Sequence, residues 1–183
     1  MSYINKTVFL FTTIISTLFL ISCNQSEDQQ NADLIPTSNE ISSTDISKSG
    51  SFVSLSKDEL NVIDGEYFTV DVVMNDFIVN EGGAVTLRFN PKILQVSNVN
   101  VDQDYWEFVN SNGHVNNDEG VISDIVFSSY QGVSGNAVIA TIEFRAISKG
   151  VSNIMLEESL TNPFSSNGEK ISVSFVSTNV VSN

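Results

Sequence analysis

The 183-residue sequence is poor in several residue types that build common functional sites. It has one cysteine, one histidine and one tryptophan, and only 8 basic residues against 22 acidic ones. A single cysteine cannot form an intramolecular disulfide, so the fold has to be stable without one. The formal net charge of −14 and the absence of a basic cluster argue against nucleic acid as a ligand, because a polyanion would be repelled.

The sequence also lacks an apolar run long enough to cross a membrane as a helix. Residues 8–21 form an apolar run of about 14 residues, whereas a spanning helix needs about 20. Lys6 precedes this run, and a basic residue followed by a short apolar run is the arrangement of a secretory signal peptide. The Leu-Ile-Ser-Cys stretch that ends at Cys23 resembles the lipobox of bacterial lipoproteins, in which the cysteine is acylated and becomes the new N-terminus. The resemblance implies a signal peptide over residues 1–22 and a lipid on Cys23.

The residues after Cys23 favour a tether rather than a folded segment. Residues 24–50 contain no aromatic side chain and are dominated by Ser, Asn, Gln, Asp and Glu, so they cannot bury enough apolar area to become ordered. We therefore expect residues 23–50 to be a disordered tether. The acidic chain would be repelled by an anionic bilayer, so we expect it to contact the membrane only through the lipid on Cys23. Asn24 is not the Asp that commonly retains lipoproteins at the inner membrane, which favours the outer membrane or cell surface.

Residues 51–183 carry the alternation of a β-sheet. Apolar and polar residues alternate over 68–74, 85–89, 140–146 and 171–175, which predicts strands with one buried and one wet face. Turn residues separate these segments, for example at Asp64-Gly65, Asn90-Pro91 and Asn167-Gly168. Only residues 90–94 have a helical pattern, and it is one turn long. The sequence therefore predicts an all-β fold, a two-sheet antiparallel β-sandwich or jelly roll.

Three blocks of this domain resemble cohesin domains. Residues 82–99, GGAVTLRFNPKILQVSNV, are similar to the third-strand signature of cohesins, with its Phe-Asn-Pro end. Residues 64–76 and 139–158 are similar to the blocks that come before and after it in that family. The resemblance implies a jelly roll of about nine strands that binds a dockerin module on another protein. It also implies that docking uses the sheet with the third, fifth, sixth and eighth strands.

The alternation itself predicts which side chains a protein partner meets. Side chains alternate between the two faces of a strand, so if Val85 and Ile125 point inward, the residues next to them along each strand point outward. These outward residues include both apolar and charged side chains, as a protein-binding patch does. The predicted partner-binding residues are Ala84, Thr86, Arg88, Ile122, Asp124, Val126 and Tyr130. The alternatives are that loops or the tether cover these residues, or that a bulge within residues 124–130 reverses the alternation. At Ala84 many dockerin-binding cohesins carry an acidic residue, and this chain has a single copy of the domain.

Direct binding of a glycan is the second hypothesis. Tyr105 and Trp106 belong to the one aromatic cluster of the domain and lie near Asp102 and Asp104, which accept hydrogen bonds from sugar hydroxyls. The alternative is that Trp106 and Phe108, which are two residues apart, are both core residues and Tyr105 alone faces the solvent.

Catalytic and metal chemistry have little support in the sequence. His114 lies in a polar stretch with no nucleophile to act with it, and residues 116–120 are better explained as a hairpin turn than as a calcium loop. We expect no catalytic residue, metal ion or cofactor. The sequence as a whole predicts a lipid-anchored, non-enzymatic binding module that captures a dockerin-bearing or similar protein and is linked to extracellular polysaccharide degradation.

Overall fold

A computed structural model describes residues 50–183 of the chain. The predicted signal peptide, Cys23 and the predicted tether up to residue 49 lie outside the described residues. Within residues 50–183 there are eleven strands and no helix, which confirms the all-β prediction. No helix in this range is long and apolar enough to cross a membrane.

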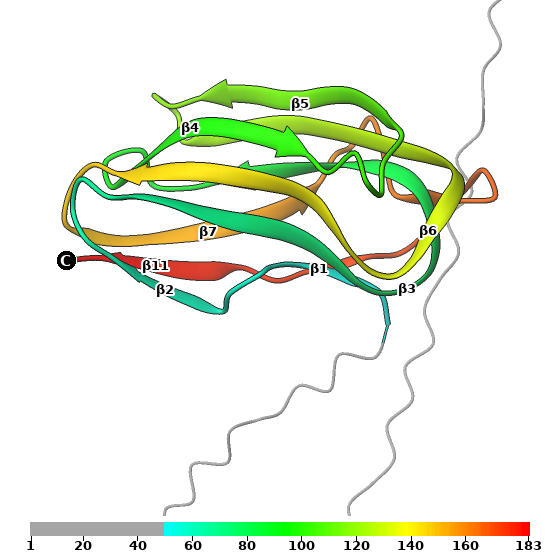
Figure 1. The fold of residues 1–183 in the computed structure, drawn as a ribbon, viewed down its shortest axis with the longest axis horizontal. Helices are drawn as coiled ribbons and strands as arrows, with labels where there is room; N and C mark the ends of the chain where they lie inside the picture. The colour runs from blue at the N-terminus through cyan, green and yellow to red at the C-terminus, as the bar shows by residue number, and fades with distance from the viewer. Residues whose placement is uncertain (1–49) are drawn as a thin grey trace, which may run out of the picture. The chain divides into compact units, whose positions relative to one another are not determined.

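Two strands of the domain are far longer than the others (Figure 1). They are β3 (Tyr67–Arg88) and β6 (Val121–Ala146), which pair with each other along most of their length. The remaining longer strands are β1 (Phe52–Leu55), β2 (Glu59–Val62), β4 (Leu94–Val101), β5 (Phe108–Asn116), β7 (Gly150–Glu158) and β11 (Thr178–Ser182). Three strands have two residues each: β8 (Ser165–Ser166), β9 (Glu169–Lys170) and β10 (Ser174–Phe175).

The β3–β6 ribbon builds both layers of the sandwich, because both of its strands bend at the right-hand end of the domain in Figure 1. The pairing register shifts repeatedly between Met74 and Gly82, where the ribbon passes from one layer to the other. One layer has the order β10-β1-β3-β6-β4 and uses the first half of β3. The other has the order β5-β6-β3-β7-β11-β2 and uses the second half of β3.

The layers differ in two details from the prediction. β1 pairs with β10 in parallel, and so does β2 with β11, so the sandwich is not wholly antiparallel. The structure has eleven strands rather than the expected nine; three of the eleven have only two residues each, and β3 and β6 each contribute to both layers. The single turn expected at residues 90–94 is present, since the amides of Ile93 and Leu94 both donate to the carbonyl of Asn90.

Aromatic side chains connect the two layers in the core. Trp106 is fully buried, and its ring centroid lies 4.5 Å from that of Phe127. Phe127 in turn packs edge-on against Phe164, with centroids 5.7 Å apart. A second group, at the other end of the core, is centred on Phe144. This packing fixes the layers rigidly, so the outer faces act as firm platforms.

Candidate functional site

The outer surface of β5, the first half of β6, the second half of β3 and β7 is the candidate site, and we call it the four-strand face. Side chains that oppose each other on paired strands lie on the same side of a sheet. Arg88 opposes Val121 on β6 and Met155 on β7, while Val126 opposes Ser111 on β5. The four-strand face consists of Thr86, Arg88, Phe108, Ser111, His114, Val121, Ser123, Val126, Ser128, Tyr130, Met155 and Glu157.

A β-bulge at Asp124 reverses the alternation that the sequence analysis assumed. Asp124 has a φ of 53°, and the register shifts between the pairs Val85–Ile125 and Leu87–Ile122. Ile122 and Ile125 are therefore both fully buried. The prediction that Ile122 lies on the binding face was therefore wrong. The alternative, that a bulge in this strand interrupts the alternation, was correct. Asp and Asn tolerate this left-handed conformation better than most residues, which is why the bulge forms there.

Ala84 was also wrongly predicted to be exposed, for a different reason. Its position on β3, opposite Val126, is on the predicted side of the sheet. However, the loop after β7 lies alongside it, since the Ser159 amide donates to the Ala84 carbonyl and the Ala84 amide donates to the Asn162 carbonyl. Ala84 consequently has no exposed surface.

The loop that covers Ala84 is fastened to the bulge by side chains. The Ser159 hydroxyl donates a 2.8 Å hydrogen bond to Oδ1 of Asp124, and it also accepts from the amide of Thr161. Asp124 was predicted to point outward, and it is half-buried. The segment of residues 159–162, which we call the clamp loop, is thus a fixed border of the four-strand face.

The exposed groups on the four-strand face are a mixture of apolar and charged side chains. Tyr130 is 87% exposed and Phe108 is 53% exposed, and both lie toward the same end of the face. At the other end Arg88 and Glu157 form a 3.0 Å ion pair across β3 and β7. Thr86, Arg88, Val126 and Tyr130 thus lie on the surface as predicted. Phe108, Met155 and Glu157 were not identified from the sequence.

The predicted glycan platform does not form. The Trp106 ring is buried and its Nε1–H donates a 2.9 Å hydrogen bond to the carbonyl of Val138, so it presents no surface to a ligand. The alternative was correct for Trp106 and for Tyr105, which is 44% exposed, but wrong for Phe108, which is exposed rather than buried. Trp106 and Phe108 do not share a side because Trp106 lies in the loop before β5, where strand alternation has not yet begun.

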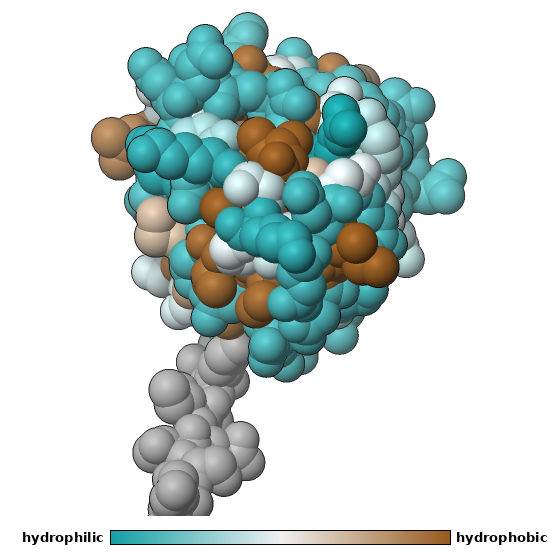
Figure 2. Space-filling model, turned by 90° about the vertical axis from the view of Figure 1, so that its left-hand side faces the viewer, coloured by the Kyte–Doolittle hydropathy of each residue, from teal (hydrophilic) through white to brown (hydrophobic). Residues whose placement is uncertain are grey.

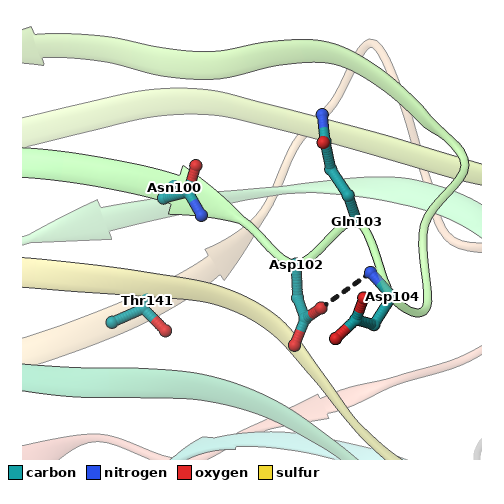
Figure 3. Close-up of a pocket in the computed structure, with 5 residues that line it drawn as sticks. All are labelled: Asn100, Asp102, Gln103, Asp104 and Thr141. Carbon is teal, nitrogen blue, oxygen red and sulfur yellow. Dashed lines mark hydrogen bonds between the residues drawn. The ribbon is translucent and has the colours of Figure 1, made fainter.

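A polar hollow adjoins the loop with Tyr105 (Figure 3). It is lined by Asn100, Asp102, Gln103, Asp104 and Thr141. The amide of Asp104 donates to Oδ1 of Asp102, so part of the acceptor capacity of these carboxylates is used within the loop. The hollow has hydrogen-bonding groups of the kind that sugars use, but it lacks the pair of exposed aromatic rings that the glycan hypothesis required.

The end of the domain with the β2–β3, β3–β4 and β6–β7 turns shows apolar areas interrupted by polar ones (Figure 2). Ile63, Tyr67 and Ile147 are exposed in or next to these turns. The guanidinium of Arg145 lies 5.5 Å from the centroid of the Tyr67 ring and covers part of it. Apolar side chains that are scattered in this way are ordinary on protein surfaces, so this end is not the candidate site.

Residues of catalytic or metal-binding type do not converge in the described part of the chain. His114 belongs to β5 rather than to a loop, and it opposes Ser123 on the four-strand face. Residues 117–120 form the predicted β5–β6 turn. No group of three or more His, Cys, Asp or Glu side chains within residues 50–183 is placed to hold a metal ion.

Comparison with known proteins identifies the fold. No protein-family model matches the sequence, and no curated protein matches it either. A non-cellulosomal cohesin from the archaeon Archaeoglobus fulgidus superposes with a TM-score of 0.61 at 12% identity, over 74% of this chain and 92% of that one. The domain has the cohesin fold.

Two further cohesins were solved as complexes with dockerins. The third ScaC cohesin of Acetivibrio cellulolyticus, bound to the ScaB dockerin, gives a TM-score of 0.58 at 14% identity over 73% of this chain and 99% of that one. The OlpA cohesin of Clostridium thermocellum, also in a dockerin complex, gives 0.57 at 12% identity over 74% and 100%. The cohesin-like sandwich predicted from three short blocks is therefore confirmed as a fold.

Proposed function

We propose that this protein is a lipid-anchored, non-enzymatic binding module that captures a dockerin-bearing protein partner on its four-strand face. The observation that carries the proposal is a cohesin fold whose four-strand face exposes apolar and charged side chains together. Interfaces between proteins typically combine an apolar centre with polar groups that fix the orientation. The solved relatives that were crystallised with dockerins support this kind of partner.

The anchor is a separate part of the proposal. Acylation of Cys23 attaches the chain to a bacterial membrane, at the outer membrane or cell surface, and the tether holds the domain away from the lipid. A captured enzyme with a dockerin would then act on polysaccharide outside the cell. Replacement by Cys23→Ala should move the protein from the membrane fraction to the soluble fraction, and it should abolish incorporation of labelled palmitate. Unchanged fractionation would contradict the anchor without affecting the docking proposal.

The docking proposal is tested with purified dockerins and the full chain. The probes are the ScaB dockerin, the dockerin of the OlpA complex and the dockerins encoded by the source organism, measured by calorimetry in calcium. We expect at least one to bind, and we expect EDTA to reverse the binding because dockerins hold calcium in acidic loops. Absence of binding, together with retention of the chain on insoluble polysaccharide, would contradict the proposal and favour the glycan hypothesis.

Variants locate the contact on the four-strand face. Phe108→Ala combined with Tyr130→Ala removes two exposed rings at one end of the face, and it should weaken dockerin binding at least tenfold without unfolding the domain. Tyr67→Ala removes a similarly exposed ring outside the four-strand face, so it is the matched control and should bind normally. Equal affinities for the double variant and the control would place the contact elsewhere.

A further inference from the structure

Leu160, in the clamp loop, is the most exposed large apolar side chain of the described residues. It is 98% exposed, and it lines a shallow hollow of about 300 Å³ together with Thr86, Arg88 and Asp124. Exposure of a whole leucine side chain to water is unfavourable, and burial of that side chain against a partner would lower the free energy of the complex. The position of Leu160 at the border of the four-strand face, rather than at a remote turn, therefore indicates a contact.

The backbone on both sides of Leu160 is held in place. Ser159 bonds to Ala84 through its amide and to Asp124 through its hydroxyl, and Asn162 bonds to Ala84 through its carbonyl. The hydroxyls of Ser159 and Thr161 also lie 3.0 Å apart. The exposed leucine is thus presented on a rigid loop, which reduces the entropy that its immobilisation costs on binding.

Carboxylates surround the four-strand face. Asp124, Glu157 and Glu158 line the hollow next to Leu160, where Arg88 is the only basic lining residue. At the other end Glu107 accepts a hydrogen bond from the Tyr130 amide. The net charge of the whole chain is −14, so its field attracts cationic surfaces and repels anionic ones. Charge complementarity therefore favours a partner with Lys or Arg at the rim of the contact.

We propose that Leu160 is the apolar anchor of the four-strand face, and that it enters a hollow on a protein partner flanked by lysine or arginine side chains. The inference rests on the proposed docking function and adds a residue and a partner chemistry to it. Selectivity would arise in two ways. A partner without the hollow leaves Leu160 in water, and a partner with an acidic rim meets like charges.

The test uses the full chain and two kinds of probe, the dockerins above and a phage-displayed library of helical peptides. Leu160→Ser removes the apolar side chain without adding charge, and it should weaken binding roughly 10- to 150-fold, the range that corresponds to burial of one leucine. Leu160→Met should bind nearly as well as the parent chain. Ile78→Ser is the matched control because Ile78 is 90% exposed and lies outside the face.

Two further readouts test the charge of the partner. Raising NaCl from about 50 to 500 mM should slow association severalfold, because salt screens the long-range attraction. Selected peptides should carry Lys or Arg within one helical turn of an apolar residue, and they should not bind the Leu160→Ser chain. Unchanged association in salt, or peptides without basic residues, would overturn the partner chemistry.

The outcomes separate this inference from the proposed function. Dockerin binding that Leu160→Ser leaves unchanged would overturn the anchor while the docking function stands. Peptides that depend on Leu160, with no dockerin binding, would refute the dockerin proposal and support the anchor. If neither dockerin binding nor peptide binding depends on Leu160, the inference is overturned.

Discussion

Replacement of Trp106 tests the distinction between a ligand platform and a core residue. Trp106 is fully buried, packs 4.5 Å from the Phe127 ring centroid and donates a hydrogen bond to the Val138 carbonyl. Trp106→Ala should therefore lower the free energy of unfolding by about 3–5 kcal/mol, the usual cost of removing a buried aromatic side chain. Trp106→Phe keeps much of the packing but loses the hydrogen bond, so we expect a cost of about 1–3 kcal/mol.

The neighbouring residue supplies the control for this prediction. Tyr105 is 44% exposed, and Tyr105→Ala should change the free energy of unfolding by only about 0.5 kcal/mol. Urea unfolding followed by circular dichroism measures all three variants. Trp106 is the only tryptophan, so its fluorescence in the parent chain reports this site alone and should resist quenching by acrylamide until the domain unfolds. Free quenching in the folded state, or equal costs for Trp106→Ala and Tyr105→Ala, would refute a core position.

Three other predictions concern the supports of the four-strand face, each measured by urea unfolding. Asn117 bonds both the amide and the carbonyl of one β4 residue, so Asn117→Ala should cost about 1–3 kcal/mol; a negligible cost would mean that water replaces these bonds. Gly120 has a φ of 68°, and a Cβ there would lie 2.2 Å from the Phe89 carbonyl oxygen, so Gly120→Ala should cost more than about 1 kcal/mol; an unchanged midpoint would contradict this. Arg88→Ala removes the half-exposed ion pair with Glu157 and should cost less than about 1 kcal/mol, whereas a larger loss would show that the pair supports the fold.

The all-β class of the fold was predictable because strand alternation is a local signal. Residues 68–74 and 140–146 bury alternate side chains as predicted, since both segments run through the centre of one layer with a regular register over most of their length. The turn at residues 117–120 was predictable for the same reason, because Asn, Asp and Gly tolerate the backbone angles that such turns need.

The bend in β3 and β6 could not be predicted in this way. Alternation shows that a segment is extended, but it does not show where a long strand changes layers. Residues 67–88 therefore gave the pattern of separate strands, although they form one continuous strand that belongs to both layers. The parallel pairs of β1 with β10 and β2 with β11 are equally hidden, because they join segments that are distant in the sequence.

The candidate site was predicted only where its strands remain regular. Arg88 and Thr86 were placed correctly on β3, whereas the alternation predicted along β6 failed at the bulge. The alternation predicted from Trp106 to Phe108 failed as well, because Trp106 precedes β5 and only Phe108 belongs to it. Leu160 was not found at all, because a single leucine between polar residues gives no periodic signal. Its proposed role depends on the clamp loop, which forms only when folding brings β7 beside β3.

Asp124 connects the interior of the domain with the four-strand face. Its left-handed backbone directs Ile122 and Ile125 into the core together, and its carboxylate accepts the hydrogen bond that fixes Ser159 next to Leu160. A residue that only formed the bulge would be replaceable by glycine, which adopts the same backbone angles at little cost. Asp124→Gly should therefore keep the core intact while it releases the clamp loop. Asp124 thus combines a positive φ, which shapes the core side of β6, with a carboxylate that holds the clamp loop at the border of the four-strand face.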